Sequence, residues 1–342
     1  MKRYLPSEQR NKALHRRTKI RESPPSGRQD WFSVQSLTFI SLNVHMKPLR
    51  FQQSAMLPLL LTCCFFAVCE PHVALADPTS AGPESRAGGV EPASDYEATL
   101  TVILKKVVTD EGLVRYDLLR GELSMDFRRV LKAVEVFDAA TLRTTEQKMA
   151  FWMNAYNVQM LQNIIETPQV NHIIDDGFAD AFFDKPFLTA GTGITLNEIE
   201  NTILRRQDGR AALKAFQPDR LDLRLHVALN CAAVSCPRLR RRAFTAANLN
   251  AELEAAMHDF AGSPAHFRAE GNRLVLSALL DWYGPDFDTQ GIPAGDLILR
   301  YMPTSHPDYA ALKQVLADRT AAQIKTLADV HFEYLWDVNA AR

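Results

Sequence analysis

The stretch TTEQKMAFWMNAYNVQMLQNII, Thr144 to Ile165, decides the fold class more than any other part of the sequence. Thr144 and Gln147 form a capping box, in which each side chain bonds to a backbone amide at the start of a helix. The apolar residues that follow recur at helical spacing, at Phe151, Ala155, Val158 and Leu161. The stretch therefore predicts one long helix from Thr144 to about Ile165.

Outward from this stretch, the chain continues to favour helices over strands. Further helices are expected at 94–107, 127–137, 196–206, 246–260, 278–283, 296–301 and 306–316. Strand-like patterns are short and lie at 112–116, 273–276 and 328–336. The segment 221–230 fits a strand by its alternating apolar residues, or a helix capped by Asp222. Helices with a few short strands in no regular alternation indicate an α+β fold, a helix-rich single domain with a small, mainly antiparallel sheet.

The N-terminal residues carry a sorting signal rather than a fold. From Met46, a short basic region precedes an apolar run that is too short to span a bilayer comfortably. Ala74-Leu75-Ala76 matches the small-x-small pattern of a signal peptidase site, so we expect cleavage after Ala76 and a periplasmic or secreted protein. A membrane anchor is the alternative. The expected organisation is a disordered or untranslated extension at 1–45, a signal peptide at 46–76, a linker at 77–93 and one globular domain at 94–342.

The composition bounds the function. The 342 residues carry a formal net charge of −1 and are 46% hydrophobic, which gives no sign of nucleic-acid binding. The sequence has neither a glycine-rich phosphate loop nor a closed set of metal ligands, so no cofactor and no metal are expected. No stable membrane span is expected after signal cleavage. Three of the five cysteines lie in the apolar run of the signal peptide, which leaves Cys231 and Cys236 in the mature chain.

Those two cysteines belong to the densest cluster of reactive side chains, HVALNCAAVSCP at 226–237. The residues around Cys236 resemble a turn into a helix start, whose amides would lower the pKa of the thiol. His226 is the candidate base for a Cys236 nucleophile, while Cys231 is more typical of a packed small residue. Two alternatives stay open: a local disulfide between the cysteines, and a core histidine bonded to a backbone carbonyl.

Glu200 is the second candidate for chemistry. Thr195 and Glu198 form a capping box for the helix at 196–206, and Glu200 falls inside its apolar stripe. A carboxylate there needs a partner or a shifted pKa, because an unpaired buried charge is costly. It would orient His226 as the third member of a nucleophile–base–orienter set. The alternative is a structural salt bridge to Arg205, Arg206 or Arg224.

Amide side chains near these residues suggest a polar pocket. Asn154 and Asn157 share a face of the long helix, with Tyr156 on an adjoining position. Asn230 lies four positions after His226, so the two are expected on one face. Amides inside a core need partners, so the asparagines either tether the backbone, which we favour for the pair on the helix, or line the pocket.

Three motifs occur in a diagnostic order: FWMNAYN at 151–157, LNEIE at 196–200 with ILR at 203–205, and HVALNCAAVSCP at 226–237. Later come Trp282-Tyr283 with Asp286-Phe287, and an ending that runs from Trp336 to Asn339. In this order they resemble an uncharacterised family, the domain of unknown function number 547. By analogy, the resemblance suggests a cysteine-protease-like fold related to papain- or transglutaminase-like thiol enzymes.

The leading hypothesis is an exported thiol hydrolase or acyl-transfer enzyme acting on an amide or ester. Cys236 would attack, His226 would accept the proton, and Glu200 would orient the imidazole of His226. Asn230 or Asn154 would donate to the developing oxyanion. The alternative is a non-catalytic domain for envelope binding or assembly, with a structural Cys231–Cys236 disulfide. A thiol–disulfide redox protein is the third hypothesis, although the spacing is wider than Cys-x-x-Cys. The substrate or envelope partner is not given by the sequence.

Overall fold

In the computed structural model, the long helix α5 spans Thr145–Glu166 and begins with the capping box that the sequence predicts. The Thr144 hydroxyl accepts the backbone N–H of Gln147, and the Gln147 side chain accepts that of Thr144. The structure describes residues 95–174, 178–288 and 291–341. The expected extension, signal peptide and linker, and the cap at Ser94, lie outside the described residues.

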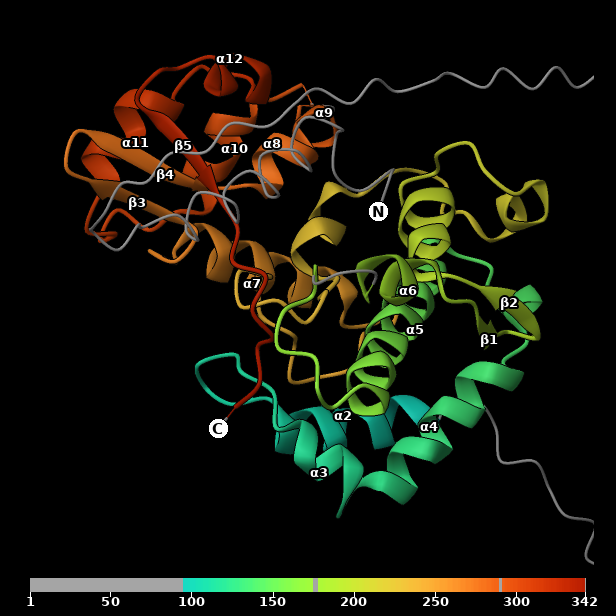
Figure 1. The fold of residues 1–342 in the computed structure, drawn as a ribbon. Helices are drawn as coiled ribbons and strands as arrows, with labels where there is room; N and C mark the ends of the chain where they lie inside the picture. Colours follow the sequence, from blue (N-terminus) through green and yellow to red (C-terminus); the bar gives the residue numbers. More distant parts are fainter. Residues whose placement is uncertain (1–94, 175–177, 289–290, 342) are drawn as a thin grey trace, which may run out of the picture. The chain divides into compact units, whose positions relative to one another are not determined.

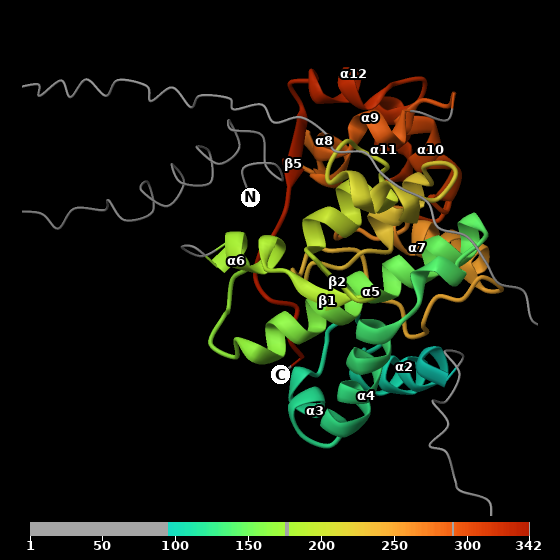
Figure 2. The same cartoon turned by 90° about the vertical axis from the view of Figure 1, so that its right-hand side faces the viewer.

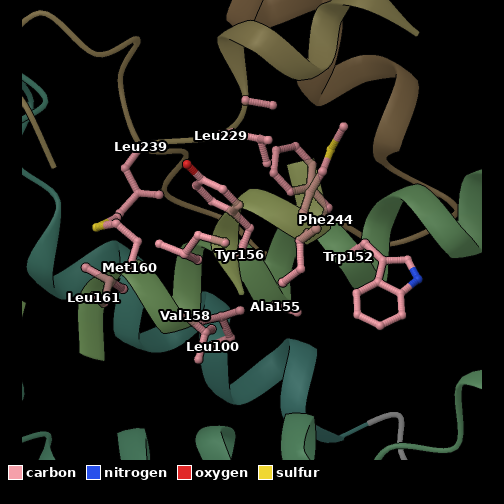
Figure 3. Packing of buried hydrophobic residues seen from close by; sticks show 14 of the residues in the cluster. Leu100, Trp152, Ala155, Tyr156, Val158, Met160, Leu161, Leu229, Leu239 and Phe244 are labelled. Carbon is pink, nitrogen blue, oxygen red and sulfur yellow. The ribbon is translucent and has the colours of Figure 1, made fainter. Parts of the chain in front are cut away.

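Three helices lie beside α5 (Figure 1): α2 (Asp95–Val107), α3 (Tyr116–Arg120) and α4 (Ser124–Val136). α5 is buried around most of its circumference, as a helix enclosed by other elements is. Figure 3 shows Leu100 of α2 gathered with Leu239 and Phe244 around this helix. The long helix therefore forms the centre of the first hydrophobic core.

A short hairpin and an unusual helix follow α6 (Phe178–Asp184). Strands β1 (Phe187–Thr189) and β2 (Thr192–Ile194) pair antiparallel around a turn in which Ala190 and Gly191 have φ of 48° and 71°. The next helix is capped by Thr195 as predicted, but Glu198–Leu204 (η2) is wound as a π-helix. The N–H of Arg205 therefore bonds to the carbonyl of Glu200, five residues back. π segments are rare in proteins, and those that occur are often found at functional sites.

The C-terminal half of the described residues forms a second core around a three-stranded sheet. β3 (Phe267–Glu270) pairs antiparallel with β4 (Arg273–Ser277), and β4 pairs parallel with β5 (Val330–Glu333). The helices of this region are α8 (Leu279–Trp282), α9 (Gly284–Phe287), α10 (Ala294–Tyr301), α11 (Tyr309–Leu316) and α12 (Ala321–Lys325). These elements lie together in both views, apart from α2–α4 (Figures 1 and 2).

The remaining elements are α7 (Leu249–Ala261), η1 (Ala139–Thr141), η3 (Ala211–Phe216) and η4 (Leu223–Val227). The described residues form a helix-rich α+β structure with small sheets, as the sequence predicts, and two of the three strand pairings among them are antiparallel. In the ranges that the structure describes, no helix combines the length and the apolar character needed to cross a membrane.

Three local expectations are corrected by the structure. No strand forms at 112–116, where Val114 makes only single bridges to Val108 and Ala340. The ambiguous segment at 221–230 is neither strand nor α-helix but the 3-10 turn η4, which Asp222 caps. The strand expected to reach Trp336 ends at Glu333. Residues 334–341 follow it outside any helix or named strand, and are here called the C-terminal strap.

Candidate functional site

Cys231 and Cys236 lie at the ends of one tight loop, residues 231–236, here called the cysteine loop. Both thiols are free, and their Sγ atoms are 2.6 Å apart. The backbone N–H of Cys231 donates to Sγ of Cys236 over 2.9 Å. The Tyr334 hydroxyl, from the C-terminal strap, lies 3.0 Å from each sulfur. The loop thus brings both sulfurs to a single point, next to one phenol.

No helix begins at Cys236, which corrects the expectation of a helix start there. Residues 234 and 235 donate their backbone N–H groups to the strap instead, at Asp337 and Leu335. The pKa of Cys236 is nevertheless lowered. Burial alone would raise it, but hydrogen bonds from the Cys231 thiol, the Tyr334 hydroxyl and nearby backbone amides outweigh burial. Burial and the neighbouring sulfur raise the pKa of Cys231 well above its usual value, so the two thiols are unequal.

Asn230 fixes the loop from within. Its Oδ1 accepts the N–H of Ala232 over 2.8 Å, and its Nδ2 donates to the carbonyl of Pro237 over 2.9 Å. Ala232 has a φ of 64°, a left-handed conformation that a residue other than glycine adopts at a cost. The Asn230 amide is therefore committed to the backbone of the loop.

Asn157 and Asn339 hold the same loop from outside. Asn157 accepts the N–H of Asn230 over 2.9 Å and donates to the carbonyl of Ala228 over 3.0 Å. Asn339 of the strap donates its N–H to the carbonyl of Ala232 over 2.8 Å. Buried amides with both ends bonded to backbone act as tethers. The interpretation of Asn157 as a structural tether is confirmed.

Asn154 lies away from the cysteines. Its Nδ2 donates to the carbonyl of Phe244 over 2.7 Å and its Oδ1 accepts the N–H of the same residue over 2.9 Å. The Nδ2 atoms of Asn154 and Asn230 each donate to a backbone carbonyl, and neither residue lines the cavity beside the cysteines. The oxyanion role assigned to them from the sequence is therefore not supported by the geometry.

His226 is paired with a carboxylate that the sequence-based hypothesis missed. Its Nε2 lies 2.8 Å from Oδ2 of Asp286, and its ring stacks on Tyr283 with centroids 3.9 Å apart. Arg205 donates to the same Asp286 oxygen over 2.6 Å. Burial would raise the pKa of Asp286, but His226 and Arg205 outweigh it and hold it at about 2. Burial lowers the pKa of His226 to about 4.

These pKa values fix the protonation of the pair near neutral pH. Asp286 is ionised and His226 is neutral. Nε2 therefore carries the imidazole hydrogen, and this N–H donates a hydrogen bond to the carboxylate. Nδ1 is then the unprotonated nitrogen, which is the form of histidine that accepts a proton. The pair has the carboxylate–imidazole geometry by which an acid orients a base.

Among the described residues no hydrogen bond joins Glu200 to His226, but Glu200 belongs to the same polar group through Tyr283 and Arg205. It is buried in the π-helix η2, where the Tyr283 hydroxyl donates to it and Arg205 lies close. Burial raises its pKa to about 7, against the effects of Tyr283 and Arg205. Asp286 therefore holds the orienting position that the sequence analysis gave to Glu200. The motif that contains Tyr283 and Asp286 was visible in the sequence, but nothing in it indicated a contact with His226.

One cavity of about 30 Å³ lies between the two cysteines, His226 and Glu200. Its walls include the sulfur-bearing residues Cys231 and Cys236, the polar residues Glu200, His226, Tyr283 and Tyr334, and the aromatic residues Tyr156, Trp282 and Trp336. The predicted residues Cys236, His226, Glu200 and Tyr156 thus meet in one place, whereas Asn154, Asn157 and Asn230 do not line it. Across residues 95–174, 178–288 and 291–341, no three His, Cys, Asp or Glu side chains are grouped to hold a metal ion.

Residues 140–261 match the model of the family described as protein of unknown function, DUF547. The chain contains a DUF547 domain. The matched region holds α5, Glu200, His226 and the cysteine loop, as the motif resemblance predicts. Asp286, Tyr283 and Tyr334, which complete the site, lie C-terminal to the matched region. No curated protein and no solved structure matches the chain.

Proposed function

We propose that this DUF547-containing protein is a thiol enzyme that hydrolyses or transfers the acyl group of an amide or ester. The observation that carries the proposal is the cavity lined by both Cys236 and His226, together with the bond from His226 to Asp286. A nucleophile, a base and a carboxylate that orients the base are the parts required for covalent acyl transfer. A thiol whose pKa is lowered by surrounding donors provides the reactive thiolate.

In the proposed mechanism, the Cys236 sulfur attacks the carbonyl carbon and the thiol proton passes to Nδ1 of His226. The protonated imidazole is stabilised by Asp286 and returns its proton to the leaving amine or alcohol. Water or a second nucleophile then releases the acyl group from the sulfur. The Tyr334 hydroxyl, 3.0 Å from the sulfur, replaces the asparagines as the donor to the developing oxyanion.

Two features bound the substrate. Within the described residues no hydrogen bond joins Cys236 to His226. Such a bond often forms only when substrate is bound, because catalytic contacts tighten in the complex. The cavity holds about two water molecules, so an acyl group enters only when its walls open. Trp282 and Trp336 are only partly buried and stack with centroids 5.6 Å apart, which makes them the side chains best placed to move.

The test is a hydrolysis assay with small activated esters and anilides, such as p-nitrophenyl acetate and an acetyl-amino-acid anilide. We expect Cys236→Ala to abolish turnover and His226→Ala to reduce it by at least a hundredfold. Val234→Ala is the matched control, because it truncates an exposed side chain of the same loop that does not line the cavity. Full activity of Cys236→Ala would refute the proposal.

The size of the cavity also favours a second candidate, a non-catalytic domain for envelope binding or assembly. A cavity of about 30 Å³ is much smaller than the few hundred Å³ of ordinary ligand pockets. In that case the polar group would serve to fix the fold. Absence of turnover on every substrate, together with a normal melting temperature of Cys236→Ala, would favour this candidate.

Export is part of the proposal. The pattern at 46–76 supports a signal peptide, and the predicted mature protein begins at Asp77 in the periplasm or outside the cell. N-terminal sequencing of the protein purified from the extracytoplasmic fraction checks this. An intact N-terminus upstream of Ala76, or recovery from the membrane alone, would contradict it.

A further inference from the structure

Cys231 forms no covalent bond in the proposed acyl transfer, yet it lies as close to the nucleophile as any side chain in the cavity. Its sulfur is 2.6 Å from that of Cys236, and a disulfide bond measures about 2.05 Å. Both sulfurs line the same cavity, and both accept contact from the Tyr334 hydroxyl at 3.0 Å. The backbone that carries them is fixed by the asparagine tethers, so the sulfurs are held facing one another.

We propose that Cys231 and Cys236 are the resolving and the attacking thiol of a reversible dithiol–disulfide pair that hydrogen peroxide oxidises. The proposal does not require acyl transfer to be the function of the site. It assigns to Cys231 the chemistry for which its position is suited. It also adds a modification that would switch off any reaction that needs the Cys236 thiolate.

The oxidation proceeds in two steps. The Cys236 thiolate attacks one peroxide oxygen, the O–O bond breaks, and the released hydroxide takes up a proton to become water, which leaves a sulfenic acid on Cys236. The Cys231 sulfur then attacks the Cys236 sulfur and loses its proton, while the S–O bond breaks and water leaves. Two thiols and one peroxide thus give one disulfide and two waters. A dithiol such as dithiothreitol reverses the change.

The roles of the two cysteines follow from their surroundings. Cys236 receives hydrogen bonds from the Cys231 amide and from the Tyr334 hydroxyl, which favour its thiolate. The pKa of Cys231 is raised by burial and by the neighbouring sulfur, so it remains a thiol until Cys236 is oxidised. Only a thiolate attacks peroxide at a useful rate, and therefore the reaction begins at Cys236.

The cavity selects the oxidant by size. Cys231 and Cys236 are 9% and 8% exposed, and the cavity beside them has a volume of about 30 Å³. Hydrogen peroxide is little larger than water and fits that volume, whereas a disulfide as large as oxidised glutathione does not. We therefore expect peroxide to oxidise the pair at least ten times faster than oxidised glutathione at equal concentration.

The experiment is peptide mapping of the full-length protein after treatment with hydrogen peroxide. Trypsin releases residues 225–238 as one peptide, because no lysine or arginine lies between Arg224 and Arg238. Both cysteines are in this peptide, so Cys63, Cys64 and Cys69 do not interfere. We expect the peptide to lose two hydrogen atoms and its capacity for alkylation, and to regain both with dithiothreitol.

Two single variants separate the steps. Cys231→Ala should stop at the sulfenic acid, which dimedone traps on residue 236, whereas Cys236→Ala should leave Cys231 unoxidised at the same peroxide concentration. Val234→Ala is the control within the loop, because the side chain of Val234 is exposed, and it should behave as the wild type. A peptide that keeps two alkylatable thiols after peroxide treatment would overturn the proposal, as would dimedone labelling of the wild type equal to that of Cys231→Ala.

This test is independent of the acyl-transfer test. A pair that oxidises reversibly in a protein without hydrolase activity would leave the redox proposal intact and refute the proposed function. A hydrolase whose peptide 225–238 resists oxidation would do the reverse. If both proposals hold, peroxide should abolish hydrolysis by the wild type and dithiothreitol should restore it.

Discussion

At the residue scale, Asp286 links the charged groups of the site. Its Oδ2 accepts both the Arg205 guanidinium, over 2.6 Å, and His226 Nε2, over 2.8 Å. The aromatic ring of Tyr283 stacks on the imidazole and lies under the guanidinium, whose carbon is 5.0 Å from the ring centroid. One carboxylate therefore neutralises a partly buried cation and fixes the tautomer of a buried imidazole. Glu200 is the remaining acid of the group, bonded to Tyr283 on the other side.

The residue that tests this arrangement is Asp286. Asp286→Asn leaves the Arg205 guanidinium largely buried without its ionised partner, so we expect the free energy of unfolding to fall by about 3 kcal/mol. The pKa of His226 should fall further, because Asp286 is the group that raises it against burial. Urea unfolding measures the first effect, and NMR titration of the imidazole measures the second.

Asp126→Asn is the matched control for that substitution. Asp126 bonds to Arg129 on the exposed surface of α4, and surface pairs of this kind contribute about 0–1 kcal/mol. Equal losses in the two variants, or an unchanged imidazole titration in Asp286→Asn, would contradict the role given to Asp286.

At the scale of elements, the cysteine loop depends on α5 and on the C-terminal strap. Asn154 and Asn157 lie on the same helix, are both buried, and each binds the backbone of a distant segment at both ends of its amide. They differ only in what they hold: Asn154 holds Phe244, and Asn157 holds the segment that leads into the cysteine loop. The two residues are therefore a matched pair for substitution, because only one of them holds the segment that leads into the cysteine loop.

We expect Asn154→Ala and Asn157→Ala each to lower the free energy of unfolding by about 2–3 kcal/mol, since each leaves buried backbone groups unbonded. Only Asn157→Ala should change the rate at which iodoacetamide alkylates Cys236, by several-fold, because only it releases the loop that sets the donors around the sulfur. Alkylation followed in the peptide 225–238 gives that rate. Equal alkylation rates in the two variants would mean that the loop holds its shape without Asn157.

The sequence predicts elements whose signals are local. The capping boxes at Thr144 and Thr195, the long helix and the strand at 273–276 all follow from neighbouring residues, and all are present. The expected helix start at Cys236 fails because the strap, about a hundred residues later, bonds to the backbone N–H groups of residues 234 and 235 and holds this segment as a loop. The left-handed Ala232 is likewise imposed by tethers from elsewhere in the chain.

The same distinction governs the site. A carboxylate inside an apolar stripe indicates that Glu200 is special, and a cysteine between a histidine and a proline indicates Cys236. Neither pattern contains the partner, because Asp286 and Tyr334 are supplied by distant segments. Sequence reasoning therefore found the residues of the cavity that carry chemistry but paired His226 with the wrong acid.

At the scale of the whole molecule, the site draws on both hydrophobic cores. The cysteines belong to the first core, Tyr283 and Phe287 belong to the second, and Tyr334 packs against both. Each polar group in the cavity therefore has a pKa that depends on the intact fold. The pH dependence of stability is the global measurement that reports this.

Glu200 and His226 act in opposite directions on that stability. The pKa of Glu200 rises from 4.5 to about 7 on folding, so the stability that it contributes is present below pH 4.5 and is lost as the pH rises through 7. The pKa of His226 falls from 6.5 to about 4, so its contribution is present above pH 6.5 and is lost as the pH falls through 4. Each amounts to about 3 kcal/mol, and between pH 4.5 and 6.5 they largely cancel.

Glu200→Gln removes the contribution of Glu200 to the pH dependence of stability, so that the contribution of His226 can be measured by itself. The variant should be more stable than the wild type above pH 7, because it has no buried carboxyl group to ionise. As the pH falls from 6.5 to 4 it should lose about 3 kcal/mol while the wild type changes much less over the same range. Urea unfolding at pH 4.5, 6.5 and 8 measures both effects, with Glu122→Gln, from an exposed ion pair, as the control. Parallel curves for Glu200→Gln and the wild type would show that Glu200 titrates as it does in the unfolded chain, and that the buried polar group is not formed as described.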